Sequence, residues 1–212
     1  MKNIDDLIDG AQQLSERGFS KGEIADELNV SRETASWLVS RSEATTQSNG
    51  EPKRTGGPHD IHVDWSALGR DSSRLAYTGM AMADLLSKRG DSVDLTVGIE
   101  KAGAPIATVV ARELDTDIAA YAPRKHQWEE GDIDELKGTF SRNFADIRDR
   151  ECYIVDDTIT SGTTMRETID AIEERGGEPV GCVVLVDKQG VEELRGVPVY
   201  SLIQAIRVGN SE

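Results

Sequence analysis

The sequence predicts an α/β protein with a short all-helical unit followed by a larger domain built on a central, mainly parallel sheet. Apolar residues recur at helical spacing over the first forty residues, and beyond residue 70 apolar runs alternate with helical stretches. Residues 42–60 lack apolar periodicity and are dense in Ser, Thr, Gly and Pro, as linkers are. We therefore expect a helical unit at 1–41, a linker at 42–60 and a second domain at 61–212.

The composition narrows the class of protein. The 212 residues are 37% hydrophobic, which suffices for a core, and their net charge of −15 argues against nucleic-acid binding through a broad basic surface. Acids are abundant and Arg outnumbers Lys, so we expect a halophilic cytosol, with an acidic mesophilic protein as the alternative. Apolar runs are too short to span a membrane, the first residues are too acidic for a signal peptide, and two cysteines make no disulfide framework. We expect a cytoplasmic protein without membrane contact.

The helical unit contains three predicted helices. Gly18 follows the first, Ser20 and Glu23 form a capping box for the second, Asn29 suits a left-handed turn, and Ser31 caps the third. The side chains expected to face inward are those of Ile4, Leu7, Ile8, Ala11, Leu14, Ile24, Ala25, Leu28, Val30, Ala35, Leu38 and Val39.

The stretch 21–40 resembles the helix-turn-helix of bacterial and archaeal transcription factors. It departs from the usual pattern at Asn29, where Gly is commonest, and at Ala35, where Val or Ile is usual. The resemblance implies that promoter DNA is a partner and that the third helix reads bases from its N-terminal end. The expected contacts are Arg32 and Ser36 to bases, and Ser31, Thr34 and Arg41 to phosphates. Trp37 either contacts the groove or covers the small core. The alternative is a three-helix dimerisation or docking bundle, which the negative charge favours.

The second domain alternates strands and helices. We expect strands at 95–99, 117–121, 152–155, 180–186 and 197–203, with helices at 72–89, 104–113 and 162–175. In parallel sheets of this kind ligands bind at the carboxyl ends of the strands. Cys152 and Cys182 lie in strands and are expected in the core, Trp65 is expected to pack at the entry to the domain, and His62 is expected to be solvated.

The strongest signal runs from Cys152 to Thr164, where a strand ends in Asp156 and Asp157 and a hydroxyl-rich loop opens a helix. Backbone N–H groups at a helix N-terminus bind phosphate, and two adjacent carboxylates suit the vicinal hydroxyls of a ribose. This segment closely resembles the phosphoribosyl pyrophosphate (PRPP) signature of the type I phosphoribosyltransferases. The resemblance implies that the two aspartates bind the ribose and that the following residues bind the 5′-phosphate, namely Thr158, Ile159, Thr160, Ser161, Gly162, Thr163 and Thr164.

Two further segments are similar to the orotate phosphoribosyltransferase branch of that family. The resemblance implies a pyrophosphate loop formed by Glu100, Lys101, Ala102, Gly103, Arg124 and Lys125. The chain departs from this branch at 126–132, where Glu129, Glu130 and Asp132 replace the expected cations, and at Lys188, the base-site candidate, where the enzymes have Arg. The residues of the sugar-phosphate site therefore match the family, whereas those of the closing loop and the base site differ from it. For this reason no catalytic residue is assigned.

The whole arrangement resembles the haloarchaeal, orotate phosphoribosyltransferase-like transcriptional regulators of sugar catabolism. This resemblance implies a homodimer that binds double-stranded promoter DNA and senses a small phosphorylated sugar. No cofactor is expected to be required and no metal site is expected, although Mg²⁺ would accompany PRPP. The alternative is an active orotate phosphoribosyltransferase that makes orotidylate from orotate and PRPP.

Overall fold

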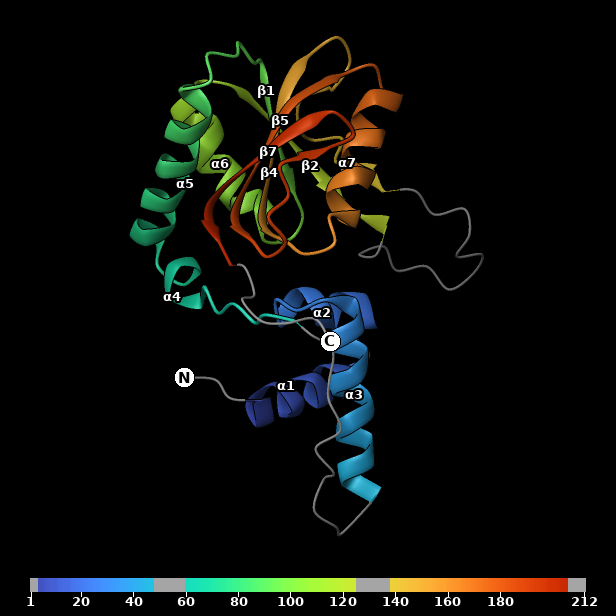
Figure 1. Ribbon diagram of the computed structural model, residues 1–212. Coiled ribbons are helices and arrows are strands. Elements are labelled where there is room, and N and C mark those ends of the chain that lie inside the picture. Colours follow the sequence, from blue (N-terminus) through green and yellow to red (C-terminus); the bar gives the residue numbers. More distant parts are fainter. Residues whose placement is uncertain (1–3, 48–59, 125–137, 206–212) are drawn as a thin grey trace. The chain divides into compact units, whose positions relative to one another are not determined.

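The computed structural model describes residues 4–47, 60–124 and 138–205. The chain divides into two compact units, 1–64 and 65–212, and each is described by itself (Figure 1). Among the helices of these described residues, none has the length and apolar character needed to cross a membrane.

The N-terminal unit consists of helices α1 (Ile4–Glu16), α2 (Lys21–Glu27) and α3 (Arg32–Gln47). Both capping-box hydrogen bonds are present: the Ser20 hydroxyl accepts from the Glu23 N–H, and the Glu23 carboxylate accepts from the Ser20 N–H. Gly18 and Asn29 have positive φ angles of 85° and 51°, so both turns form as predicted. A small apolar core closes between the helices; its buried members are Ala11, Ile24, Ala25, Leu28, Val30, Ala35, Leu38 and Val39.

The limits of this unit differ from the sequence prediction at both ends of the expected linker. Helix α3 continues to Gln47 rather than ending at Arg41, because no Gly or Pro occurs before Gly50 to interrupt it. The buried Ser42 hydroxyl donates to the Val39 carbonyl at 2.7 Å, which satisfies it within the helix. At the other end, residues 60–64 belong to the helical unit.

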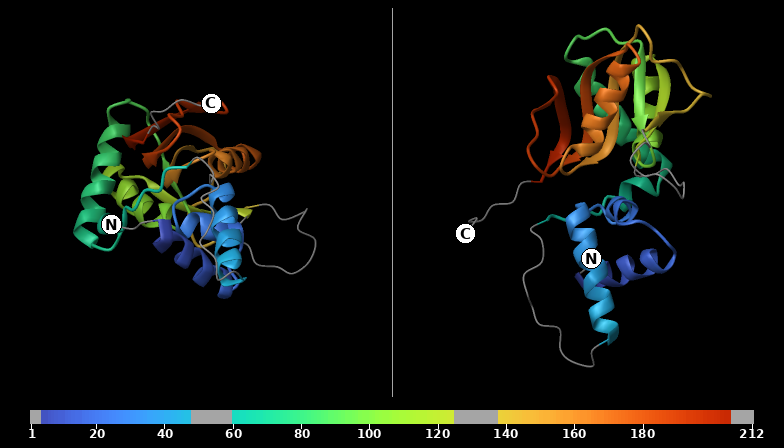
Figure 2. Two further views of the ribbon diagram at one scale, coloured as in Figure 1. Left: turned by 60° about the horizontal axis from the view of Figure 1, so that its bottom comes forward. Right: turned by 90° about the vertical axis from the view of Figure 1, so that its right-hand side faces the viewer.

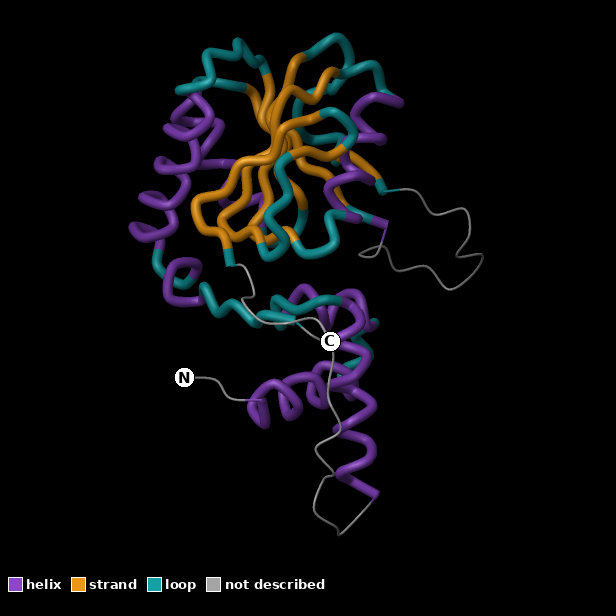
Figure 3. Tube along the Cα trace, in the orientation of Figure 1, coloured by secondary structure: helices purple, strands orange, loops and turns teal. Residues whose placement is uncertain are grey.

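The C-terminal unit contains a seven-stranded sheet in the order β3-β2-β1-β4-β5-β7-β6. Figure 3 shows its strands in orange. The five central strands are parallel, and the two-residue strands β3 and β6 are antiparallel to their neighbours. The predicted mainly parallel sheet is thus confirmed; β3, β6 and the short helix α4 were not predicted, because they are too short to show a period. The strands are β1 (Leu95–Ile99), β2 (Asp117–Ala122), β3 (Thr139–Phe140), β4 (Glu151–Ile159), β5 (Glu178–Asp187), β6 (Glu193–Leu194) and β7 (Val197–Gln204).

Helices cover both faces of the sheet, as Figures 1 and 2 show. Helices α5 (Ser72–Ser87) and α6 (Gly103–Leu114) lie on one face and α7 (Thr163–Glu174) lies on the other; α4 (Ser66–Gly69) precedes α5. Alternate residues of each central strand enter the core under α7, where Ile154 of β4 and Val184 of β5 are fully buried with Ile169 of the helix. On the other face Gly98 permits close approach of α6, since a Cβ there would lie 2.7 Å from that of Ala107.

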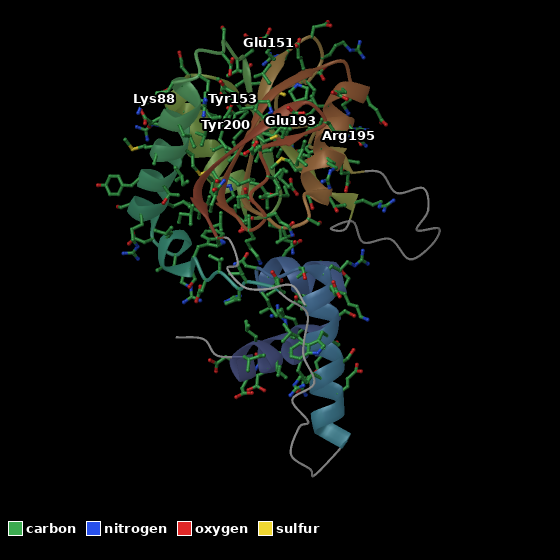
Figure 4. All side chains as sticks on the ribbon, in the orientation of Figure 1. Lys88, Glu151, Tyr153, Glu193, Arg195 and Tyr200 are labelled. Atoms are coloured by element: carbon green, nitrogen blue, oxygen red, sulfur yellow. The ribbon has the colours of Figure 1, made fainter. Side chains whose placement is uncertain are left out.

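Aromatic and charged side chains meet near the amino ends of the strands (Figure 4). The buried Tyr153 hydroxyl donates to Asp91 at 3.0 Å, and the Arg89 guanidinium lies 4.2 Å from the centre of the Tyr200 ring. Cys152 and Cys182 are fully buried, as predicted, and burial raises the pKa of the Cys152 thiol to about 12. These contacts lie at the end of the sheet opposite the loops that follow β1 and β4.

Candidate functional site

The polar loops predicted to bind a ligand follow two adjacent strands. From β1 the chain crosses to β2 on one side, whereas β4 pairs with β1 on the other side, and all three strands are parallel. The carboxyl ends of β1 and β4 therefore form a topological switch point, which is where open parallel sheets bind ligands.

A glycine brings the two loops into contact. A Cβ built on Gly103 would lie 2.6 Å from the Val155 carbonyl oxygen and 2.9 Å from the Asp156 Cα. Real Cβ atoms do not approach backbone this closely, so only glycine fits at this position. The loop after β1, which contains Glu100, Lys101 and Ala102, is thus held against the first aspartate of β4.

The phosphate loop is shorter than the sequence suggested. Thr158 and Ile159 are strand residues that pair with Val186 and Asp187 of β5, and the Ile159 side chain is buried in the core. Both are β-branched residues, which favours the strand over a loop. Ile159 therefore presents no side chain to a ligand, and the loop proper is Thr160–Gly162.

The loop turns sharply into α7 at Gly162, whose φ is 73°. The Ser161 and Thr163 hydroxyl oxygens lie 2.9 Å apart, and the Arg166 guanidinium donates to the Ser161 carbonyl at 2.9 Å. The first N–H groups of a helix lack intrahelical acceptors and attract anions, so Thr163 and Thr164 begin α7 where a phosphate would be held.

The hairpin formed by β6 and β7 supports this turn. A Cβ at Gly162 would lie 3.3 Å from the Leu194 side chain, and Arg195 forms a 3.1 Å ion pair with Asp170 of α7. Figure 4 labels Arg195 together with Glu193 on the hairpin beside α7. The hairpin therefore packs against one side of the loop.

The two aspartates are held by a chain of hydrogen bonds. The Asp157 N–H donates to Asp156 Oδ1 at 2.9 Å, and the Thr158 hydroxyl donates to Asp157 Oδ2 at 3.2 Å. The Trp65 indole Nε1–H donates to the same Oδ2 atom at 2.9 Å. Sequence reasoning expected Trp65 to pack at the entry to the domain and missed this contact, because nothing in the sequence links two residues 92 positions apart.

Arg124 follows β2 at the same edge of the sheet. Its backbone N–H donates to a Glu167 carboxylate oxygen at 2.8 Å, and the Tyr121 hydroxyl donates to the same oxygen at 2.9 Å. Burial, reinforced by Glu167, raises the pKa of Tyr121 well above its ordinary value, so the phenol stays protonated as a donor. Helix α7 thereby holds the Arg124 backbone at the end of β2, the strand next to β1. Lys125 and the acidic stretch 126–132 lie outside the described residues.

Lys188 follows β5, the strand next to β4. Its backbone N–H donates to the Ile159 carbonyl at 3.1 Å, and the residue is buried. The neighbouring Asp187 carboxylate accepts from the N–H groups of Gln189, Gly190 and Val191 at 2.7–2.9 Å, which fixes the turn after β5. The base-site candidate is thus held at the same edge of the sheet as the phosphate loop.

These groups suit a phosphorylated sugar. A helix N-terminus and hydroxyl groups accept a phosphate, and a pair of carboxylates accepts hydroxyl donors. In the described ranges no three metal-ligating side chains come together to hold a cation by themselves.

The predicted DNA contacts differ in how accessible they are. Arg32 is exposed in the first turn of α3, Ser36 is half-buried one turn later, and the Arg41 guanidinium lies 5.2 Å from the centre of the Trp37 ring. Trp37 itself packs against the small core, which supports its role as a cover. Thr34, the third residue of α3, is buried and faces the capping residue Ser31, whose hydroxyl lies 2.9 Å from its own. This arrangement disfavours a phosphate contact from Thr34.

Residues 60–62 pack on the helical unit. The Ser31 N–H donates to the Asp60 carboxylate, and the His62 Nδ1–H donates to the Leu28 carbonyl at 2.7 Å. His62 was expected to be solvated, but its Nε2 is buried without a hydrogen-bond partner. The expectation was wrong because the Gly and Pro residues that shortly precede His62 suggested a solvated linker.

The fold and site define a phosphoribosyltransferase-type domain. A family profile described as "Phosphoribosyl transferase domain" matches residues 65–209. Solved structures with this fold include orotate phosphoribosyltransferase of Mycobacterium tuberculosis in complex with PRPP (18% identity, 68% of this chain and 80% of that chain, TM-score 0.54). Another is adenine phosphoribosyltransferase of Thermoanaerobacter pseudethanolicus (19% identity, 76% and 98%, TM-score 0.56). At these identities the likeness shows the fold, which is compatible with the use of PRPP and Mg²⁺.

Whole-chain similarity is much higher to proteins named Transcriptional regulator GfcR. The relative from Haloquadratum walsbyi is 71% identical over 98% of this chain and 95% of its own length. The relative from Halobacterium salinarum is 58% identical over the full length of both, and that from Methanocella arvoryzae is 43% identical over 98% and 100%. The chain therefore belongs to the phosphoribosyl transferase domain family that includes these archaeal regulators.

Proposed function

We propose that this protein is a cytoplasmic, DNA-binding transcriptional regulator of central sugar catabolism that senses a phosphoribosyl or related sugar-phosphate metabolite. The observation that carries the proposal is the presence, in one chain, of a phosphate loop at a switch point and a separate three-helix unit with Arg32 exposed on α3. The regulator names of relatives that match this chain over nearly its whole length support it.

DNA would be read by the N-terminal part of α3. Arg32 lies in the first turn, where a recognition helix contacts base edges, and an Arg can form two hydrogen bonds to a guanine. Ser36 follows on the same face one turn later. Ser31 and Arg41 remain candidates for phosphate contacts, because phosphate contacts orient a protein on the duplex without specifying sequence.

The sensed metabolite would lie across the ends of β1 and β4. Its 5′-phosphate would be held at the start of α7, its ribose hydroxyls by Asp156 and Asp157, and its pyrophosphate, if present, by residues 100–103 with Arg124 and Lys125. Mg²⁺ would bind together with the pyrophosphate and supply positive charge there.

The second candidate function is an active orotate phosphoribosyltransferase, which the same phosphate loop supports equally. Two features weigh against it. Lys188 stands where the enzymes have an Arg, and Lys lacks the fork that binds a carboxylate with two hydrogen bonds. Acidic residues 129, 130 and 132 stand where cations would neutralise the departing pyrophosphate.

The test is to measure PRPP binding and orotidylate formation with the same purified protein. We expect calorimetry to detect PRPP binding in the presence of Mg²⁺, and orotidylate to form very slowly or not at all. Rapid orotidylate formation would contradict the regulator and favour the enzyme, whereas the lack of PRPP binding would contradict the proposed ligand.

We further propose that the protein acts as a homodimer. A single recognition helix reads only a half-site, so a dimer whose half-sites lie about 34 Å apart, or a multiple of this, would read a complete operator. Light scattering is expected to give the mass of two chains for the free protein and the mass of two chains plus one duplex for the complex with DNA. A monomeric mass under both conditions would contradict the prediction.

A further inference from the structure

Six consecutive residues, Asp60–Trp65, carry contacts to both candidate sites, and we call them the connecting segment. At one end, in the helical unit, the Asp60 carboxylate accepts from the Ser31 N–H and His62 donates to the Leu28 carbonyl. At the other end, in the α/β unit, the Trp65 indole donates to Asp157. The residues between are neither helix nor strand.

Asp60 binds at the start of the proposed recognition helix. The first N–H groups of a helix carry partial positive charge and have no intrahelical acceptor, so they bind either a carboxylate or a phosphate. Ser31 directly precedes α3, and its N–H is taken by Asp60. A DNA phosphate approaching this end of the helix would therefore meet a negative charge that competes for the same donor.

Trp65 binds one of the carboxylates that the proposed function assigns to the ribose. Asp157 Oδ2 already accepts from the Trp65 indole and from the Thr158 hydroxyl. An indole N–H is only a donor, so it cannot accept from a ribose hydroxyl and must compete with it for this oxygen. Trp65 also packs over Gly69, since a Cβ at Gly69 would lie 2.4 Å from its ring, so its ring and α4 are expected to move together.

The segment is short enough to transmit such a displacement. Five residue steps separate Asp60 from Trp65, which span about 18 Å at most when fully extended. Each end of the segment is anchored by a hydrogen bond within its own unit, and only four residues lie between the two anchors. A shift of the Trp65 ring away from Asp157 is therefore expected to reach Asp60 instead of being absorbed along the way.

We propose that the connecting segment couples the sugar-phosphate site to the recognition helix. Ribose hydroxyls that bind Asp157 displace the Trp65 indole, and the segment then withdraws the Asp60 carboxylate from the Ser31 N–H. The start of α3 is thereby opened to a DNA phosphate, so ligand binding and DNA binding favour each other, as linkage requires. This inference rests on the proposed function, because it needs PRPP or a similar sugar phosphate to bind at Asp157.

The test is hydrogen exchange at the Ser31 amide, measured on the full chain with and without saturating PRPP and Mg²⁺. In the wild type we expect PRPP to speed exchange about 5–150-fold, the range of typical couplings between sites. In Trp65→Phe, which keeps a ring but lacks the N–H, exchange is expected to be fast without PRPP and unchanged by it. Trp65→Phe is also expected to bind PRPP at least as tightly, because a competitor for Asp157 is gone.

Two more variants guard against a simple folding defect. Asp60→Ala is expected to speed Ser31 exchange irrespective of PRPP. Glu27→Ala, which removes an exposed acid of the helical unit, is expected to behave as the wild type. Calorimetry on the same samples separates the two proposals. Absence of PRPP binding would contradict the proposed function and the coupling with it, whereas PRPP binding that leaves Ser31 exchange unchanged in the wild type would overturn only the coupling.

Discussion

In the C-terminal unit the candidate groups follow strands whose register is fixed by a large buried core, whereas in the N-terminal unit they lie on the solvent side of one helix. Asp156 has its place because β4 pairs with β1 and β5 and Gly103 presses against it. Arg32 is exposed, and no comparable packing fixes its side chain. The comparison teaches that the sugar-phosphate site is built into the fold, whereas DNA reading depends on a few side chains added to a small helical core.

The largest expected effect breaks the first half of this comparison. Asp156→Asn combined with Asp157→Asn removes both carboxylates, and hydrogen bonds to charged groups contribute about 1.5–3 kcal/mol each. We expect PRPP affinity to fall about 100-fold or more in calorimetry, while the helical unit keeps its circular dichroism and binds DNA in the absence of PRPP. Asp84→Asn with Asp94→Asn, two exposed acids of the same unit, is the control for lost charge. Wild-type PRPP affinity in the first double variant would rule out the site.

Sequence reasoning was most accurate where a period or a turn residue carried the signal. The capping box at Ser20, the turn at Asn29 and the five central strands were all predicted. It was less accurate where a residue's surroundings come from distant parts of the chain. Ile159 was expected in the phosphate loop but completes a strand, since its pairing with Asp187 of β5 is invisible in the local pattern.

The same reasoning explains the errors in the helical unit. Thr34 was expected to contact a phosphate, but it is buried and its hydroxyl contacts that of Ser31. Trp65 and His62 were assigned unspecific roles because their partners, Asp157 and the Leu28 carbonyl, are far away in sequence. The contacts that suggest communication between the sites were therefore the part that the sequence could not reveal.

The second prediction sharpens the other half of the comparison. Arg32→Ala is expected to weaken binding to the cognate site by about 1–3 kcal/mol and to relax the sequence preference, because one bidentate contact to guanine is lost. Fluorescence anisotropy with cognate and altered duplexes measures both. Arg17→Ala is the matched control, since Arg17 is exposed outside α3 and stacks on Phe19 at 4.9 Å. An Arg32→Ala protein with unchanged affinity and preference would contradict the assignment.

The third prediction concerns the buried core of the C-terminal unit. Burial raises the pKa of Cys152 from 9.0 to about 12, so above pH 9 the unfolded chain loses this proton while the folded chain keeps it. Folding stability therefore falls with rising pH, by about 1.4 kcal/mol at pH 10 from this thiol. Urea unfolding at pH 7 and pH 10 should show a smaller pH-dependent loss in Cys152→Ala than in the wild type. Equal losses of stability in the two proteins would show that burial does not raise the pKa of the Cys152 thiol.

The central claim, that one chain links a sugar-phosphate site to DNA reading, is tested most directly by the DNA affinity with and without PRPP. The measurement uses a duplex that the wild-type protein selects from genomic fragments, at one fixed salt concentration, because affinity for DNA depends on salt. We predict that saturating PRPP with Mg²⁺ lowers the Kd by about 5–150-fold in the wild type and leaves it unchanged in the Asp156→Asn, Asp157→Asn protein. Equal Kd values for the wild type with and without PRPP would contradict the account.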